Sequence, residues 1–184
     1  MLEWVELAFG KVNYIIGKVL SILLLLMTLN VFYDVIMRYF LHNSSVAMQE
    51  MEWHLFGVII LFGISVALLD EGHVRVDFLY DRFTVRTQAV INIIGTVFFL
   101  LPLGLLIFFG SIDYVIDAYE INEISQDPGG LPYRWIIKAM IPASFALLIV
   151  YSFGYTVKNI NIYRNNGHAS LSERTGSAKG ETGA

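Results

Sequence analysis

The residues of this chain that could do chemistry are polar and charged groups set into very apolar sequence. Asn30, Asp34 and Arg38 stand four residues apart, so on a helix they form a single polar stripe. An ionisable group at the centre of a membrane costs on the order of 3 kcal/mol, and such groups therefore face protein or water. The simplest interpretation is an ion pair between Asp34 and Arg38, with Arg38 near the rim and able to extend toward water.

A second interpretation turns the same stripe toward another helix. Glu50 and Glu52 lie at the start of the next apolar segment, on the same side of the membrane, where one of them can reach Arg38 and join the two helices. A pathway for a substrate or ion along the stripe is a third alternative. Under the first two interpretations these residues form structural polar pairs rather than a reaction centre.

A second group of charged residues precedes the last apolar segment. It is acidic and consists of Asp113, Asp117, Glu120, Glu123 and Asp127. One interpretation is the solvated end of a helix. The other is a docking surface for a soluble partner with basic patches, recognised through complementary charge.

The chain offers little for catalysis or cofactor binding. It contains no cysteine, which leaves no thiolate ligand, no disulfide and no covalent haem attachment. Haem between helices needs axial ligands that face one another, and only His54 lies near an apolar segment, whereas His42, His73 and His168 fall in loops or the tail. We therefore expect no enzyme, no metal site and no cofactor, and the absence of a basic patch argues against nucleic acid as a partner.

The surrounding sequence predicts an all-α integral membrane protein. The 184 residues are 56% hydrophobic and 15% charged, against about 25% charged residues in average soluble domains. A spanning helix needs roughly 20 mostly apolar residues, and four segments qualify: about 14–37, 53–69, 89–110 and 135–157. These form the predicted transmembrane domain, 14–160, and Pro102 and Pro142 are expected to kink the third and fourth spans.

Basic residues predict the orientation of the four spans, because cytoplasmic loops carry an excess of Lys and Arg. The side of the two termini and of the loop between the second and third spans holds 9 of the 12 basic residues, with Lys18 near the start of the first span counted there, and the opposite side holds Arg38, Arg134 and Lys138. Both termini are therefore expected in the cytoplasm, with phospholipid around the spans and the other two loops on the outer side.

Three segments that flank the predicted spans have distinctive sequence patterns. Residues 1–13 carry a polar stripe on an otherwise apolar helix and predict an interfacial amphipathic helix rather than a signal peptide, and the loop 74–86 has a similar pattern. Residues 161–184 are polar and small, and we expect a disordered cytoplasmic tail. The third helix is expected to continue past residue 110 until Asp127, Pro128, Gly129 and Gly130 break the chain.

Four short motifs, in order, resemble one membrane-protein family. They are Asn30 with Arg38-Tyr39, Gln49-Glu50 followed by Gly63, His73-Val74-Arg75-Val76-Asp77, and Leu131-Pro132-Tyr133-Arg134-Trp135. Over roughly residues 19–157 the chain resembles the small, DctQ-type permease subunit of TRAP (tripartite ATP-independent periplasmic) transporters. The third motif, with His73, Arg75 and Asp77, is the most specific, whereas many relatives carry a second acidic residue at the position of Gln49.

The resemblance implies a bacterial inner-membrane subunit that pairs with a large membrane subunit. That partner would hold the substrate and sodium sites, and a periplasmic binding protein would deliver an organic acid such as a carboxylate or sulfonate. The small subunit would be the static scaffold of a sodium-coupled transporter. Two alternatives stay open on the residues alone: a membrane-anchor electron-transfer subunit, which a haem absorbance band would reveal, and an adaptor of another membrane complex.

Overall fold

The computed structural model of the chain describes residues 2–69 and 83–180, with side chains described for 9–69 and 83–164. Every regular element within these ranges is a helix. The helices are α1 (Leu2–Phe40), α2 (Val46–Leu69), α4 (Val85–Gly95), the π-helix η1 (Thr96–Leu100), α5 (Leu101–Glu120) and α6 (Trp135–Gly180).

Four helical stretches are long and apolar enough to cross a membrane. They are Phe9–Phe40, Val46–Leu69, Val85–Glu120 and Trp135–Arg164. Each contains one of the predicted spans, so the prediction of an all-α chain with four candidate spans is confirmed. The helices are longer than the predicted spans because an apolar run marks only the part that lipid favours, whereas a helix continues until a cap or breaker ends it.

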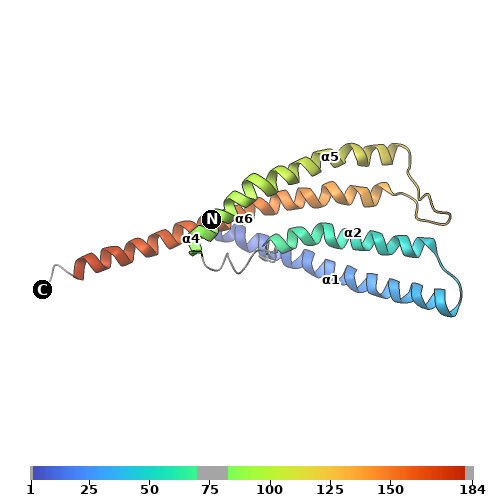
Figure 1. Ribbon diagram of the computed structural model, residues 1–184, viewed down its shortest axis with the longest axis horizontal. Helices are drawn as coiled ribbons and strands as arrows, with labels where there is room; N and C mark the ends of the chain where they lie inside the picture. Colours follow the sequence, from blue (N-terminus) through green and yellow to red (C-terminus); the bar gives the residue numbers. More distant parts are fainter. Residues whose placement is uncertain (1, 70–82, 181–184) are drawn as a thin grey trace.

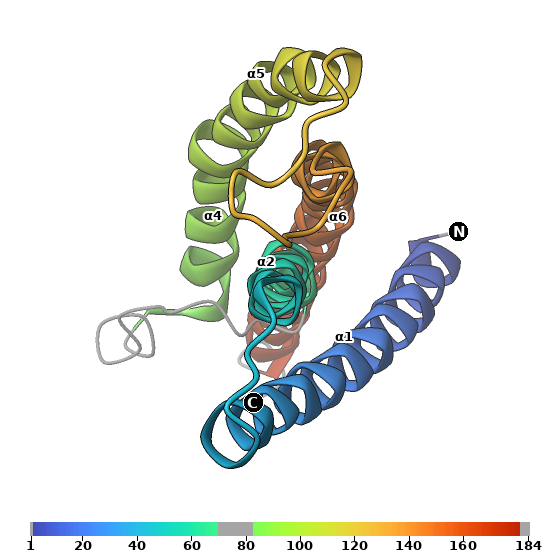
Figure 2. The same ribbon diagram turned by 90° about the vertical axis from the view of Figure 1, so that its right-hand side faces the viewer.

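The helices stand side by side in the order α1, α2, α6 and then the α4–α5 segment (Figures 1 and 2). α1 begins and α6 ends at one end of the molecule, which we call the terminal end. The turn 41–45 and the α5–α6 loop, residues 121–134, lie at the opposite end, the loop end. An even number of antiparallel crossings therefore places both chain ends on one side.

The small core lies toward the terminal end, where α2 and α6 meet. Its buried apolar residues are Leu68, Leu148, Tyr151 and Tyr155. Phe9 of α1 packs edge-on against Tyr151, with ring centroids 5.8 Å apart. Ser65 donates to the backbone oxygen of Ser144 at 3.4 Å. Both serines are fully buried, and such small residues let two membrane helices approach closely.

The third span bends near Pro102, where the sequence predicted a kink. Pro102 lacks a backbone N–H, and its ring crowds the carbonyl four residues earlier. The helix accommodates it through η1, which ends two residues before Pro102, and α4 and α5 follow a curved path (Figure 1). Pro142 lies inside α6, which continues through it.

Two flanking segments differ from their predictions. The segment 1–13 does not form a separate helix, because α1 runs without a break from Leu2 to Phe40. Asn13, the last residue of the predicted polar stripe, is 5% exposed, whereas its apolar neighbour Val12 is 45% exposed. Asn13 therefore faces the other helices, whereas Gly10 of the same stripe is exposed.

The C-terminal segment differs as well. α6 continues to Gly180, through most of the range 161–184 that was predicted to be disordered. A helix that is already formed extends without a new nucleation cost, and the sequence has no proline after Pro142 to stop it.

Candidate functional site

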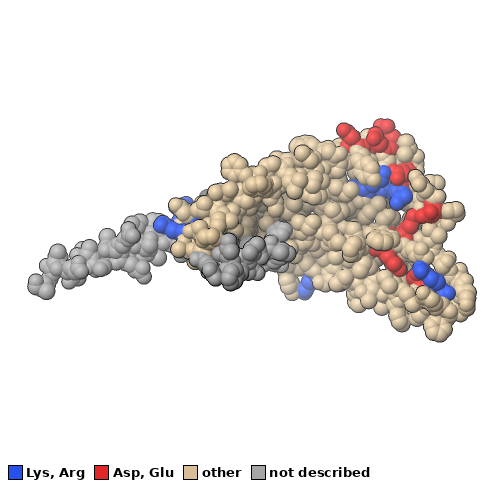
Figure 3. All heavy atoms as spheres, viewed as in Figure 1, with Lys and Arg blue, Asp and Glu red and all other residues tan. Residues whose placement is uncertain are grey.

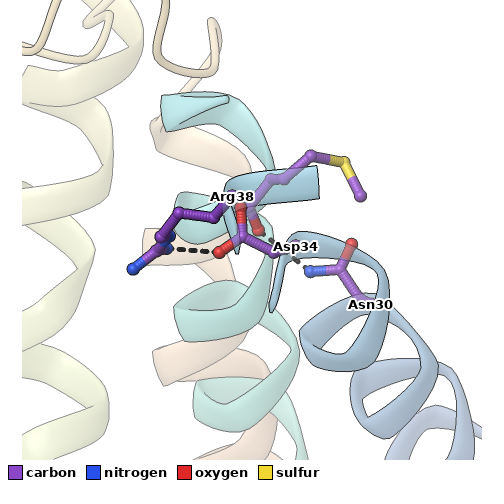
Figure 4. A network of polar contacts seen from close by, with 4 residues as sticks. Asn30, Asp34 and Arg38 are labelled. Atoms are coloured by element: carbon purple, nitrogen blue, oxygen red, sulfur yellow. Dashed lines mark hydrogen bonds and ion pairs between the residues drawn. The ribbon is translucent and has the colours of Figure 1, made fainter. Parts of the chain in front are cut away.

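The polar stripe of α1 lies at the loop end, and its residues make one contact within α1 and one contact with α2 (Figure 4). Arg38 donates to a carboxylate oxygen of Asp34, one turn away on the same helix. Asn30 reaches across to α2, and its Nδ2 donates to the backbone oxygen of Met48 at 2.9 Å. The ion pair inside α1 is the one of the first interpretation, whereas the contact to α2 is made by Asn30 and not by Arg38 with Glu50 or Glu52.

The two acidic residues of α2 do not share the stripe. Glu50 accepts from the hydroxyl of Ser125 and, at 2.6 Å, from the backbone N–H of Leu131, both in the α5–α6 loop. Glu52 is half-buried on the same helix. The structure therefore joins Glu50 to a loop far along the chain, and Arg38 to Asp34.

The acidic group before α6 divides into two kinds of residue. Asp113, Asp117 and Glu120 are exposed near the end of α5, and Asp127 is exposed in the loop. Glu123 instead forms an ion pair with Lys138 of α6. The acidic side chains on the face drawn in Figure 3 gather at the loop end, away from the termini.

Lys138 joins α5 and α6 at this end. Besides its pair with Glu123, its ammonium group lies 3.9 Å from the ring centroid of Tyr114 on α5. A cation over an aromatic face is attracted by the ring quadrupole, and the attraction grows where water is excluded. Lys138 therefore fixes the start of α6 against the end of α5.

A further polar contact lies near the terminal end. Asn92 of α4 donates to Oδ1 of Asn159 on α6 at 2.8 Å, and Asn159 donates to the backbone oxygen of Tyr155 at 2.9 Å. Asn159 is 3% exposed. The sequence analysis missed this pair, and a polar amide within each of two apolar segments is the signal that could have found it.

The remaining motif lies outside the described residues. His73, Arg75 and Asp77 fall in the range 70–82, as does most of the predicted amphipathic loop 74–86. The last residues of that loop are described: Thr84 caps α4 by accepting from the N–H of Thr87 at 3.3 Å.

Together these contacts define a helical membrane protein whose polar groups connect neighbouring helices. Asn30 joins α1 to α2, Glu50 joins α2 to the α5–α6 loop, and Lys138 joins α6 to α5. Within the described residues, no group of three or more His, Asp or Glu side chains is placed to hold a metal ion. The arrangement can hold helices in register and present a surface.

Comparison with known proteins gives the family. Residues 27–161 match the family of tripartite ATP-independent periplasmic transporters, DctQ component. This chain therefore belongs to the DctQ component family, and the predicted family is confirmed. It is a transporter component and not an enzyme, which sets aside the electron-transfer and adaptor alternatives.

Three curated relatives have similar sequences. The ectoine TRAP transporter small permease protein TeaB of Halomonas elongata is 28% identical over 82% of this chain and 79% of that protein. A putative TRAP transporter small permease protein of Haemophilus influenzae is 28% identical over 73% of this chain and 86% of that protein.

The third relative is much longer. The isethionate TRAP transporter permease protein DctMQ of Oleidesulfovibrio alaskensis is 28% identical over 82% of this chain, but the match covers 23% of that protein. Most of that permease therefore lies outside the part that resembles this chain.

Proposed function

We propose that this chain is the static scaffold of a sodium-coupled transporter in a bacterial inner membrane. The observation that carries the proposal is the single row of four candidate spans, joined to one another by polar contacts at the loop end. In the described residues each span is helical along its whole length, and the third includes the π-helical turn η1. Substrate sites of secondary transporters are typically formed by discontinuous helices near the middle of the membrane, so the moving, substrate-binding part belongs to a partner.

The partner is a large membrane subunit that supplies the substrate and sodium sites. A single row of helices leaves broad apolar faces for lipid and for such a partner, and Phe98, Phe99 and Leu106 are 70%, 74% and 71% exposed. The longer isethionate permease, of which this chain resembles one part, supports a partner of this kind.

The transported solute is a small organic acid. The relatives carry the names of ectoine and isethionate, a carboxylate and a sulfonate, and either chemistry suits the proposal. A soluble periplasmic binding protein delivers the solute at the loop end, and the chain itself holds no cofactor.

The proposal is tested by purification and transport. A tag on the C-terminus, extraction in mild detergent and mass spectrometry are expected to recover a large permease. Proteoliposomes with both subunits and the loaded binding protein are expected to take up solute with an inward sodium gradient, and not with a potassium gradient. Recovery of the chain by itself, or uptake by the chain without the large subunit, would contradict the scaffold role.

The exposed acidic end of α5 supports a docking role for this region. Reversing the charge of Asp113, Asp117 and Glu120 to Lys is expected to weaken docking of the binding protein, most strongly at low ionic strength, where screening is least. Replacement by the neutral amides is the matched control and is expected to have a smaller effect. Equal docking by wild type and charge-reversed protein at low salt would leave these residues as a solvated helix end.

A further inference from the structure

The carboxylate of Glu50 connects two distant parts of the chain at the loop end. One oxygen accepts from the Ser125 hydroxyl, 75 residues along the sequence, and the other from the Leu131 N–H, 81 residues along. Hydrogen bonds to an ionised carboxylate are about twice as strong as those between neutral groups. One side chain of α2 therefore fixes the α5–α6 loop at two points.

The loop is closed on itself between these two points. The N–H of Ser125 donates to the oxygen of Leu131 at 3.2 Å, and that of Gly130 to the oxygen of Asp127 at 3.0 Å. The Ser125 hydroxyl, which donates to Glu50, also accepts from the N–H of Asp127 at 3.2 Å. Hydroxyl, carboxylate and backbone thus form one network rather than separate contacts.

Packing around Gly130 shows how closely Glu50 and the loop fit. A Cβ at this position would overlap the side chain of Ser125 and lie 2.8 Å from Oε2 of Glu50. Only glycine leaves room for the carboxylate to reach Leu131. The shape of the loop and the position of Glu50 therefore depend on each other.

The beginning of the loop is also fixed. α5 ends in a Schellman motif, in which Glu123 N–H donates to Ala118 at 2.9 Å and Asn122 N–H to Tyr119 at 3.1 Å, with Asn122 at φ 46°. Arg134 N–H then donates to the oxygen of Glu123 at 2.9 Å, where α6 is about to begin. With both ends closed in this way, Glu50 supplies the contact between the loop and a neighbouring helix.

The outward part of the loop has the character of a contact surface. Ile121 and Ile124 are 72% and 66% exposed, beside the exposed carboxylate of Asp127. A soluble protein with an apolar spot inside a basic rim would complement these groups together with the acidic end of α5. Glu50 is half-buried, so it acts on this surface through the loop.

We propose that Glu50 is a positioning residue that holds the α5–α6 loop in the shape on which the periplasmic binding protein docks. The inference rests on the proposed function for its docking partner, whereas the anchoring of the loop stands on the contacts of this chain. It assigns to an acidic residue of the second span a role in presenting a surface formed between the third and fourth spans.

The test uses the assembled transporter with Glu50→Gln and Ser125→Ala. Amide hydrogen exchange over 125–131 is expected to rise about tenfold in each variant, since loss of a hydrogen bond to a charged group is worth about one factor of ten in an equilibrium. Transport is then measured against the concentration of loaded binding protein. Half-saturation is expected to move to a higher concentration of binding protein, by at most about tenfold, with an unchanged rate at saturation, because the apparent affinity falls with the fraction of complexes whose loop has the docking shape.

Two variants serve as controls. Ser125→Thr keeps the hydroxyl and is expected to have the wild-type exchange over 125–131 and the wild-type half-saturation concentration. This recovery is not expected if Ser125→Ala acts through general unfolding. Glu52→Gln makes the same chemical change two positions along α2, and residues two apart do not share a helix face. It is expected to leave exchange over 125–131 unchanged.

Each result decides a different part of the inference. Unchanged exchange in Glu50→Gln and Ser125→Ala overturns the anchoring. Faster exchange with an unchanged half-saturation concentration overturns the link to docking. If the wild-type complex shows no transport that depends on the binding protein, the proposed function is overturned. The docking half of the inference is then overturned with it, whatever the exchange shows.

Discussion

At the scale of single residues, the two partners of the α1 ion pair differ markedly in their exposure. The side chain of Asp34 is 5% exposed and that of Arg38 is 46% exposed. Removing the buried partner leaves an arginine that can extend toward water, whereas removing the arginine leaves a buried carboxylate without its cation. The two single substitutions are therefore not equivalent.

This inequality gives a prediction for stability. Arg38→Ala is expected to destabilise the chain by about 2 kcal/mol, and the double variant Asp34→Asn with Arg38→Ala by clearly less, because an unpaired buried charge costs more than a lost pair. Thermal unfolding in detergent and complex yield measure this. Binding of solute to the isolated periplasmic protein is the control and is expected to stay unchanged. A double variant as unstable as Arg38→Ala would show that the carboxylate is not the source of the loss.

The sequence predicted part of this polar arrangement, for a physical reason. Asn30, Asp34 and Arg38 are neighbours on one helix, and helical spacing is enough to place them together. The partners of Glu50 lie 75 and 81 residues away in a loop. Their positions depend on how α2 stands beside α6, which no local pattern of the sequence specifies.

At the scale of elements as well, local structure was predictable from the sequence, and contacts between distant segments were not. Four apolar segments predicted four helices, because no other structure satisfies the backbone inside lipid except a closed barrel. The order of the helices in the row was not predictable, since most of the surface of each segment is apolar and the few polar residues do not show which helix they face. The contacts that specify neighbours are small and polar, such as Ser65 with Ser144.

The Asn92–Asn159 pair gives a prediction for one helix contact. Asn92→Leu is expected to destabilise the chain by about 1 kcal/mol, because the Oδ1 of Asn159, a residue only 3% exposed, loses its donor. The double variant with Asn159→Leu is expected to recover part of the loss, as a double-mutant cycle in detergent would measure. Thr28→Ala is the control, since this exposed hydroxyl bonds only within α1. Additive effects of the two leucine substitutions would contradict a direct contact.

At the scale of the whole molecule, the row of helices has a clear polarity. Acidic side chains gather at the loop end (Figure 3), whereas both chain ends lie at the other. The basic residues of the sequence are biased the opposite way, with 9 of 12 on the side of the termini and the second loop. Because basic segments stay in the cytoplasm, the terminal end is expected there and the loop end in the periplasm.

Cysteine labelling measures this orientation directly, because the chain contains no cysteine of its own. In intact cells, a membrane-impermeant maleimide is expected to label Ser44→Cys, which lies exposed in the turn at the loop end. Ser177→Cys, near the end of α6, is expected to react only after the inner membrane is permeabilised. The cysteine-free parent is the control for background. The reverse pattern would place the termini outside and invert the molecule, and labelling of both positions from outside would contradict an even number of crossings. Confirmed labelling would put the loop held by Glu50 on the side where a soluble binding protein can reach it.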